Sequence, residues 1–199
     1  MRVTQTRHKL TAGARRQGVL EAACLVFSRS SYRGATTAEI AREAGISEPI
    51  LYRHFGSKRD LYLACLGHAW ASFREEAERA IAVDPVGCLG VIADRYMAKS
   101  KRLRMVDLWI QALTEASEDK VIAGALRTQV REVHDFFAEL IRDGQRRGVV
   151  HPDRDPLAEA WIFVGGGLLA TMDSRLGGLL GDDLQRVRES RRSWMLANP

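Results

Sequence analysis

The sequence predicts an all-α protein, and three observations support this fold class. Apolar residues recur at the three- and four-residue spacing of an amphipathic helix along most of the chain. No segment of the sequence has the regular apolar-polar alternation typical of a half-buried strand. Glycine, proline, serine and threonine interrupt the helical pattern at the places where one helix would end and another begin.

The first helix is predicted over residues 12–30. Leu20, Cys24 and Phe27 recur at helical spacing and form one apolar stripe, which we expect to be buried. The segment SSYRGA then interrupts the pattern, and Gly34 allows a backbone turn that other residues resist.

Two short helices joined by a tight turn are predicted next. The first begins with a capping box, in which the Thr36 hydroxyl accepts from the backbone of Glu39 and the Glu39 carboxylate bonds back. Gly45 ends this helix because glycine readily adopts the left-handed conformation. Ser47 can cap the second helix, which tolerates Pro49 in its first turn. The pair forms a helix-turn-helix.

A long helix is predicted from Ser57 to about Ala82, where Asp84-Pro85 ends it. Five further helix-length segments follow, over residues 86–100, 103–117, 119–147, 155–177 and 183–196. The long helix leaves no flexible joint between the segments before and after it. We therefore expect motion of one segment to be transmitted to the other.

Positive charge is concentrated in the first third of the chain. Residues 1–60 carry 11 Lys and Arg against 5 Asp and Glu, whereas the remaining residues carry 19 against 20. A basic module joined to a near-neutral one suggests a surface for a polyanion at one end only. A chance solvated face explains the composition equally well, so individual side chains must decide.

Several classes of protein are disfavoured by the sequence. Cys24, Cys65 and Cys88 form no CxxC pair and are predicted to be buried thiols in a reducing compartment. The basic N-terminus lacks the apolar segment of a secretory signal, and the apolar run over 160–170 is too short to span a bilayer. We expect a cytoplasmic protein with no membrane association. Catalytic, metal-binding and phosphate-loop motifs are missing, so the sequence predicts no enzyme, no cofactor and no metal.

The second helix of the helix-turn-helix carries side chains suited to nucleic acid. In this motif the N-terminal residues of the second helix enter the major groove of DNA. Tyr52, Arg53, His54 and Lys58 follow closely and combine an aromatic hydroxyl with cationic groups that suit phosphate oxygens. Neither catalysis nor core packing would require this mixture, so we predict a DNA-binding head.

The stretch TTAEIAREAGISEPILYRHFGSKRDL closely resembles the signature of the TetR family of bacterial regulators. The resemblance covers about residues 11–65, whereas the remainder resembles the family in layout, including a penultimate helix that begins with Asp155-Pro156. It implies an N-terminal three-helix helix-turn-helix DNA-binding head over 1–60. A C-terminal helical ligand-binding and dimerisation domain would occupy 61–199, and the homodimer would bind a palindromic double-stranded operator.

The resemblance also implies which head residues contact DNA. Base edges would be faced by Glu48, Pro49, Ile50 and Arg53, phosphates would be held by Thr37, Tyr52, His54 and Lys58, and Ser47 completes the set. Arg53 is the best candidate for a guanine contact. Glu48 is an anion near phosphates, so it costs affinity unless it accepts from a cytosine amine. Four of these residues also have an alternative role. Glu48 would then be a favourable charge at a helix N-terminus, Tyr52 and His54 would only pack against the head, and Lys58 would be an ordinary surface lysine.

Three features bear on how far the resemblance extends. Ser31-Tyr32 replaces the usual glycine-aromatic pair, so the turn after the first helix can differ. Ala38 offers at most a methyl contact where some members carry a longer polar side chain. The basic arm with Arg2, Arg7 and Lys9 either reaches an adjacent minor groove or is a frayed tail.

The helical body is predicted to bind a ligand. The segment over 119–147 is amphipathic, with an apolar stripe at Ile122, Leu126, Val130, Val133, Phe137 and Leu140. In this family some large apolar side chains would line a pocket for a small, largely apolar effector. The candidates are Trp70, Met97, Met105, Trp109, His134, Trp161 and Met172. The alternative for His134 is a flank residue with satisfied hydrogen bonds.

Three consecutive glycines lie in the middle of the predicted 155–177 helix, where each costs about 0.8–1 kcal/mol relative to alanine. Close approach of another helix would offset this cost, and in this family the last two helices meet their partners across a two-fold axis. Gly165, Gly166, Gly167 and Leu168 are therefore predicted at the dimer interface. A kink or a ligand close to the backbone is the alternative.

Together these features predict a ligand-responsive transcriptional regulator, a repressor that binds its operator as a homodimer and is released by a small-molecule effector. We expect a ligand among Trp70, Met105, Trp109 and Trp161 to tilt the long helix and separate the two heads. The alternative is a DNA-binding dimer without an effector, and a helical enzyme is much less supported.

Overall fold

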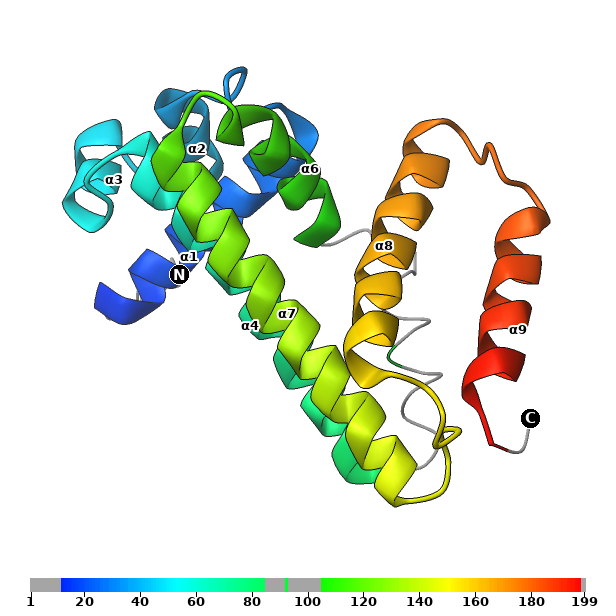
Figure 1. The fold of residues 1–199 in the computed structure, drawn as a ribbon. Helices are drawn as coiled ribbons and strands as arrows, with labels where there is room; N and C mark the ends of the chain where they lie inside the picture. Colours follow the sequence, from blue (N-terminus) through cyan, green and yellow to red (C-terminus); the bar gives the residue numbers. More distant parts are fainter. Residues whose placement is uncertain (1–11, 85–91, 93–104, 198–199) are drawn as a thin grey trace, which may run out of the picture. The chain divides into compact units, whose positions relative to one another are not determined.

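The computed structural model describes residues 12–84, 92 and 105–197, and its regular structure is helical, as predicted (Figure 1). The helices are α1 (Ala12–Arg29), α2 (Thr37–Glu43), α3 (Glu48–His54), α4 (Lys58–Val83), α6 (Met105–Ala116), α7 (Lys120–Arg146), α8 (Pro156–Arg175) and α9 (Asp183–Met195). Of the helix predicted over 86–100, only residue 92 is among the described residues. Within them, extended pairing is confined to an isolated bridge between Val150 and Leu196.

The chain divides into two compact units, Met1–Cys65 and Leu66–Pro199. The division falls inside α4, so the first two turns of α4 belong to the N-terminal unit and the rest belongs to the C-terminal unit.

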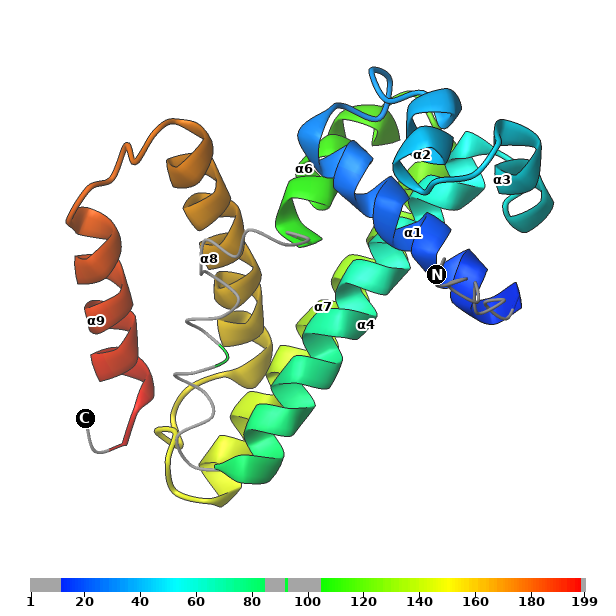
Figure 2. The ribbon, with the colours of Figure 1, turned by 180° about the vertical axis from the view of Figure 1, so that it is seen from behind.

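In the N-terminal unit α1, α2, α3 and the start of α4 lie together (Figures 1 and 2), and their buried apolar side chains form its core. The predicted α1 stripe is confirmed, because Leu20, Cys24 and Phe27 are all buried. The Phe27 ring meets the Tyr62 ring of α4 edge-on, with centroids 4.9 Å apart. Burying these aromatic and aliphatic side chains is the main stabilisation of so small a unit.

The local signals that delimit the short helices are mostly confirmed. Thr36 and Glu39 form the complete capping box, and Gly45 has a φ of 67°. Ser47 is the residue before α3, but its side chain makes no capping hydrogen bond within the described head. Ser57 does cap α4, because its hydroxyl accepts from the backbone N–H of Asp60 at 3.0 Å.

In the C-terminal unit α7 packs against both α6 and α8, and the body portion of α4 runs beside it (Figures 1 and 2). The predicted stripe of α7 is buried except at Val130, which is half-buried. Phe137 of α7 stacks on Phe163 of α8 at 4.7 Å, and Phe136 meets Trp70 of α4 at 5.5 Å. Aromatic rings of α7 therefore pack against both α8 and α4.

A buried amide links three helices of this unit. Gln129 of α7 accepts from the indole N–H of Trp109 on α6 at 2.7 Å and donates to the backbone oxygen of Leu66 on α4. Both Gln129 and Trp109 are buried. The amide fixes the registry of these helices, because a buried polar group left without its partner costs free energy.

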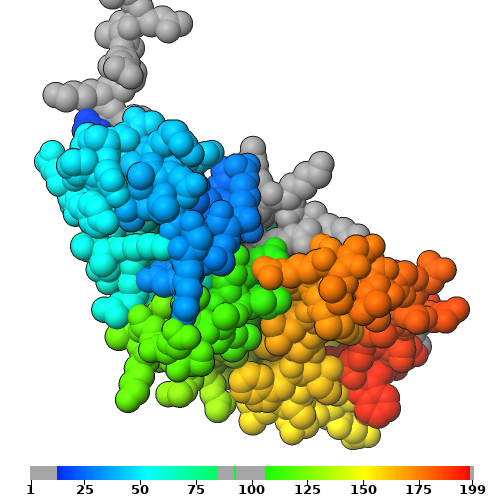
Figure 3. All heavy atoms as spheres, turned by 90° about the horizontal axis from the view of Figure 1, so that it is seen from above, coloured from blue at the N-terminus to red at the C-terminus, as the bar shows by residue number. Residues whose placement is uncertain are grey.

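Helix α9 is fastened to α8 by a polar cluster. Glu159, which is only 6% exposed, accepts from the Arg191 guanidinium and, at 3.0 Å, from the Trp194 indole. Arg154 lies over the Trp194 ring at 3.5 Å and donates to the Trp194 carbonyl oxygen. The side chains of α8 (yellow to orange) and α9 (red) form one continuous surface in the space-filling view (Figure 3).

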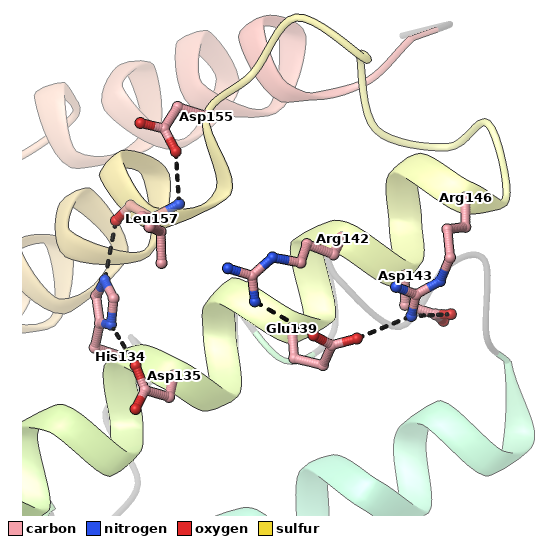
Figure 4. A network of polar contacts seen from close by, with 8 residues as sticks. All are labelled: His134, Asp135, Glu139, Arg142, Asp143, Arg146, Asp155 and Leu157. Atoms are coloured by element: carbon pink, nitrogen blue, oxygen red, sulfur yellow. Dashed lines mark hydrogen bonds and ion pairs between the residues drawn. The ribbon is translucent and has the colours of Figure 1, made fainter.

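The exposed side of α7 carries a chain of ion pairs, whereas His134 points toward α8 (Figure 4). Glu139 and Asp143 accept from Arg142, Arg146 and Arg147, and the hydrogen bond from Arg146 is the largest cause that lowers the pKa of the Glu139 carboxyl below its ordinary value. Such exposed pairs contribute little to stability.

Candidate nucleic-acid interface and effector region

The helix-turn-helix has one buried face and one exposed face. Ile40 and Ala41 of α2 and Leu51 of α3 are buried and hold the two helices against the head core. On the outer face of α3, Ile50 is 37% exposed and Tyr52 is 47% exposed. Both side chains are therefore accessible to a partner on this side of α3.

The other predicted base-contact residues lie at the same end of the head. Pro49 and Arg53 are exposed, whereas Glu48 is half-buried. His54, predicted to hold a phosphate, is half-buried at the last position of α3. The structure therefore gathers the predicted set on and around α3, as the short helix requires.

Lys58 lies at the start of α4, close to the loop between α1 and α2. Its ammonium is 3.4 Å from the Arg33 carbonyl oxygen and 4.9 Å from the centre of the Tyr32 ring. The Tyr32 ring in turn packs on Tyr62 at 4.9 Å. Lys58 is half-buried, and its ammonium is held near the head surface by the Arg33 carbonyl oxygen and the face of the Tyr32 ring.

A contact across the turn between α2 and α3 was not predicted from the sequence. The Thr37 hydroxyl donates to the carboxylate of Glu48, and it also lies 3.2 Å from the Tyr52 hydroxyl. Two of the hydroxyls expected to hold phosphates are thus in contact with each other, and one of them, that of Thr37, donates to an anion of the protein itself.

Two other titratable groups of the head have shifted pKa values. Hydrogen bonds from the Thr36 backbone and hydroxyl hold the pKa of the Glu39 carboxyl below its ordinary value. Burial, together with the neighbouring Cys24 thiol, raises the pKa of the Cys65 thiol. The prediction of buried thiols is confirmed for Cys24 and Cys65, whereas Cys88 lies outside the described residues. A protonated buried thiol is a poor nucleophile, so this pair serves packing.

The candidate effector residues fall into two groups. Trp70 and Trp109 are buried, and the indole N–H of Trp109 already donates a hydrogen bond to the Gln129 side chain. Trp161 and Met172 are 39% and 41% exposed on α8. Met97 and the side chain of Met105 lie outside the described residues.

His134 and Trp161 are brought together by the packing of α7 on α8. Their rings are 4.4 Å apart, and the Arg131 guanidinium lies 5.2 Å from the centre of the Trp161 ring. His134 is buried, its Nε2 donates to the Leu157 carbonyl oxygen at 3.0 Å, and its Nδ1 lies 2.9 Å from the Asp135 carboxylate (Figure 4). The ring is therefore satisfied by protein groups.

The glycine triplet lies in the middle of α8. Gly165 is exposed, and a methyl group added there would meet nothing within 4 Å in the described part of the chain. Gly167 is buried, and its carbonyl accepts from the Thr171 hydroxyl at 3.0 Å, while Gly166 and Leu168 are half-buried. The backbone at Gly165 is thus open to close approach from outside the described part of this subunit.

Residues 19–65 match the model of the bacterial regulatory proteins of the tetR family. The HTH-type transcriptional regulator UidR of Escherichia coli K12 is 28% identical over 142 residues, which are 69% of this chain and 70% of UidR. The transcriptional activator FasR of Mycolicibacterium smegmatis is 48% identical over 59 residues, or 30% of this chain and 27% of FasR. Residues 19–65 therefore form a DNA-binding region of the TetR type.

The TetR-type fold extends over nearly the whole chain. A solved structure of a candidate transcriptional regulator from Saccharomonospora viridis, in complex with choline, superposes with a TM-score of 0.72. It is 20% identical, and the match covers 91% of this chain and 97% of that one. Both of these relatives, UidR and FasR, are named as transcriptional regulators. None of the described helices is long and apolar enough to cross a membrane.

Proposed function

We propose that this chain is a TetR-family, ligand-responsive repressor, which binds a palindromic operator as a homodimer and is released by a small, largely apolar effector. The exposed face of α3 is the observation that carries the proposal. It places Ile50, Tyr52 and Arg53 on one short helix of a head with excess positive charge. A helix of this size fits the major groove of DNA, and the positive charge favours phosphates.

The exposed apolar surface of α8 and α9 supports the homodimer. Large apolar side chains that are at least 39% exposed there include Trp161, Ile162, Met172, Leu176, Val187 and Trp194. Together with the open backbone at Gly165, this surface allows close packing of a second subunit. Two heads could then occupy half-sites about one DNA turn, or roughly 34–36 Å, apart.

Selection of genomic fragments with the purified protein tests the DNA-binding function and identifies the operator. We expect enrichment of an inverted repeat, and we expect Arg53→Ala to lose the preference at one position of each half-site, at a cost of about 1–3 kcal/mol. Arg42→Ala, which removes the same charge from an exposed position of α2, is the matched control and should keep the preference. An unchanged preferred sequence with Arg53→Ala would exclude the assigned base contact, and no enrichment with any variant would exclude the function.

The salt dependence of binding tests the phosphate role of Lys58. Each neutralised phosphate releases counterions, so the logarithm of the binding constant should fall with the logarithm of salt concentration by about 0.9 per contact. Lys58→Ala should lower that slope by about 1 per head and weaken all sequences alike, whereas Lys58→Arg should retain the slope. Fluorescence anisotropy at four salt concentrations measures it. An unaltered slope in the alanine variant would remove Lys58 from the phosphate set.

A further inference from the structure

The head places an anion of its own where DNA phosphates are expected to bind. Glu48 is the first residue of α3, and its carboxylate accepts from the Thr37 hydroxyl of α2. The Thr37 hydroxyl is also 3.2 Å from the hydroxyl of Tyr52, one turn further along α3. Under the proposed function, Thr37 and Tyr52 are the hydroxyls that hold the DNA backbone.

The carboxylate and a phosphate compete for the same proton. A hydroxyl has one hydrogen to donate, and both an ionised carboxylate and a phosphate oxygen can only accept. When Thr37 donates to a phosphate, the bond to Glu48 must break. The released carboxylate then lies close to a second anion, and the two repel each other.

DNA sequence decides whether the released carboxylate finds a new donor. In the major groove, cytosine presents its N4 amine and adenine its N6 amine, and the Glu48 carboxylate can accept from either. Guanine presents only acceptors there, and thymine presents an acceptor and a methyl group. Opposite those bases Glu48 loses its bond to Thr37 and gains nothing in return.

We propose that Glu48 is a specificity-determining residue, which penalises binding to DNA that places no cytosine or adenine amine within reach of its carboxylate. The proposal rests on the DNA-binding function proposed above. Glu48 acts mainly against the wrong DNA, because its bond to Thr37 has to be given up on every sequence and is replaced only on the right one. The carboxylate therefore lowers affinity for unrelated duplexes more than it lowers affinity for the operator.

Dissociation constants for the selected operator and for a scrambled duplex of equal length, at one salt concentration, test this proposal. We expect Glu48→Gln and Glu48→Ala to bind the scrambled duplex about tenfold more tightly than the unaltered protein, the usual size of one charged hydrogen bond. Operator binding should stay equal or weaken, so the ratio of the two constants falls about tenfold or more. Glu43→Gln removes one negative charge from an exposed position of α2 and is the matched control.

A second background isolates the contact with Thr37. In Thr37→Val the carboxylate has no hydroxyl to release, so adding Glu48→Gln should change binding to the scrambled duplex no more than Glu43→Gln does. Equal tightening of both duplexes by Glu48→Gln and Glu43→Gln would overturn the proposal, because Glu48 would then act only through its charge. Failure of the folded, unaltered protein to bind any duplex would instead overturn the DNA-binding function itself.

Discussion

Replacing Gln129 with leucine should lower the free energy of unfolding by about 2–3 kcal/mol, although leucine is apolar and similar in size. Trp109 is 1% exposed, and its indole N–H donates to the Gln129 side chain, so no water replaces the lost acceptor. The Leu66 carbonyl loses its donor in the same substitution. Denaturation followed by circular dichroism measures the change, which should lower the midpoint without altering the slope.

Two further variants separate the hydrogen bonds from the change of side chain. Gln185→Leu makes the same substitution at an exposed position of α9 and should change stability by less than about 0.5 kcal/mol. Trp109→Phe removes the donor, so adding Gln129→Leu to it should cost less than Gln129→Leu alone. Strictly additive losses in this cycle, or a loss no larger than that of Gln185→Leu, would show that the buried amide does not link the helices.

Gln129 also illustrates where the sequence stops being informative. Its position, three residues after Leu126 and four before Val133, lies on the buried side of α7, but a glutamine there predicts nothing about its partners. Those partners are 20 and 63 residues away along the chain. The same holds for Glu159, whose partners Arg191 and Trp194 lie more than thirty residues later. Only the packing of the helices brings these groups together.

The head was predictable in more detail because its signals are local. Thr36 and Glu39 are three residues apart, and Gly45 needs only its own backbone conformation to end α2. Ser47 is the exception, since its position before α3 was predicted but its capping bond is not formed. The contact of Thr37 with Glu48 spans a turn, so its geometry depends on the turn and could not be inferred from spacing. The roles of these residues on DNA remain predictions.

Saturating operator DNA should weaken the binding of an effector by the same factor by which that effector weakens operator binding. This follows because a ligand shifts an equilibrium only through its different affinities for the two states of the protein. For allosteric proteins the factor is typically about 5–150-fold. A compound identified by thermal-shift screening can be titrated calorimetrically into the free protein, into its operator complex, and into the protein mixed with the scrambled duplex as the control. Trp161, which is 39% exposed and whose ring centre lies 4.4 Å from that of His134, provides an independent fluorescence signal.

The three titrations distinguish the ligand-responsive regulator from a DNA-binding dimer without an effector. If the compound binds at an allosteric site, its affinity should fall with the operator and stay unchanged with the scrambled duplex, at a salt concentration where that duplex does not bind. A fall with both duplexes would indicate that the compound competes for the basic head, since any polyanion would then displace it. Equal affinity in all three titrations would exclude coupling between the compound and the operator, because linkage requires the effect in both directions. Regulation by that compound would then be ruled out even if the protein binds its operator as a dimer.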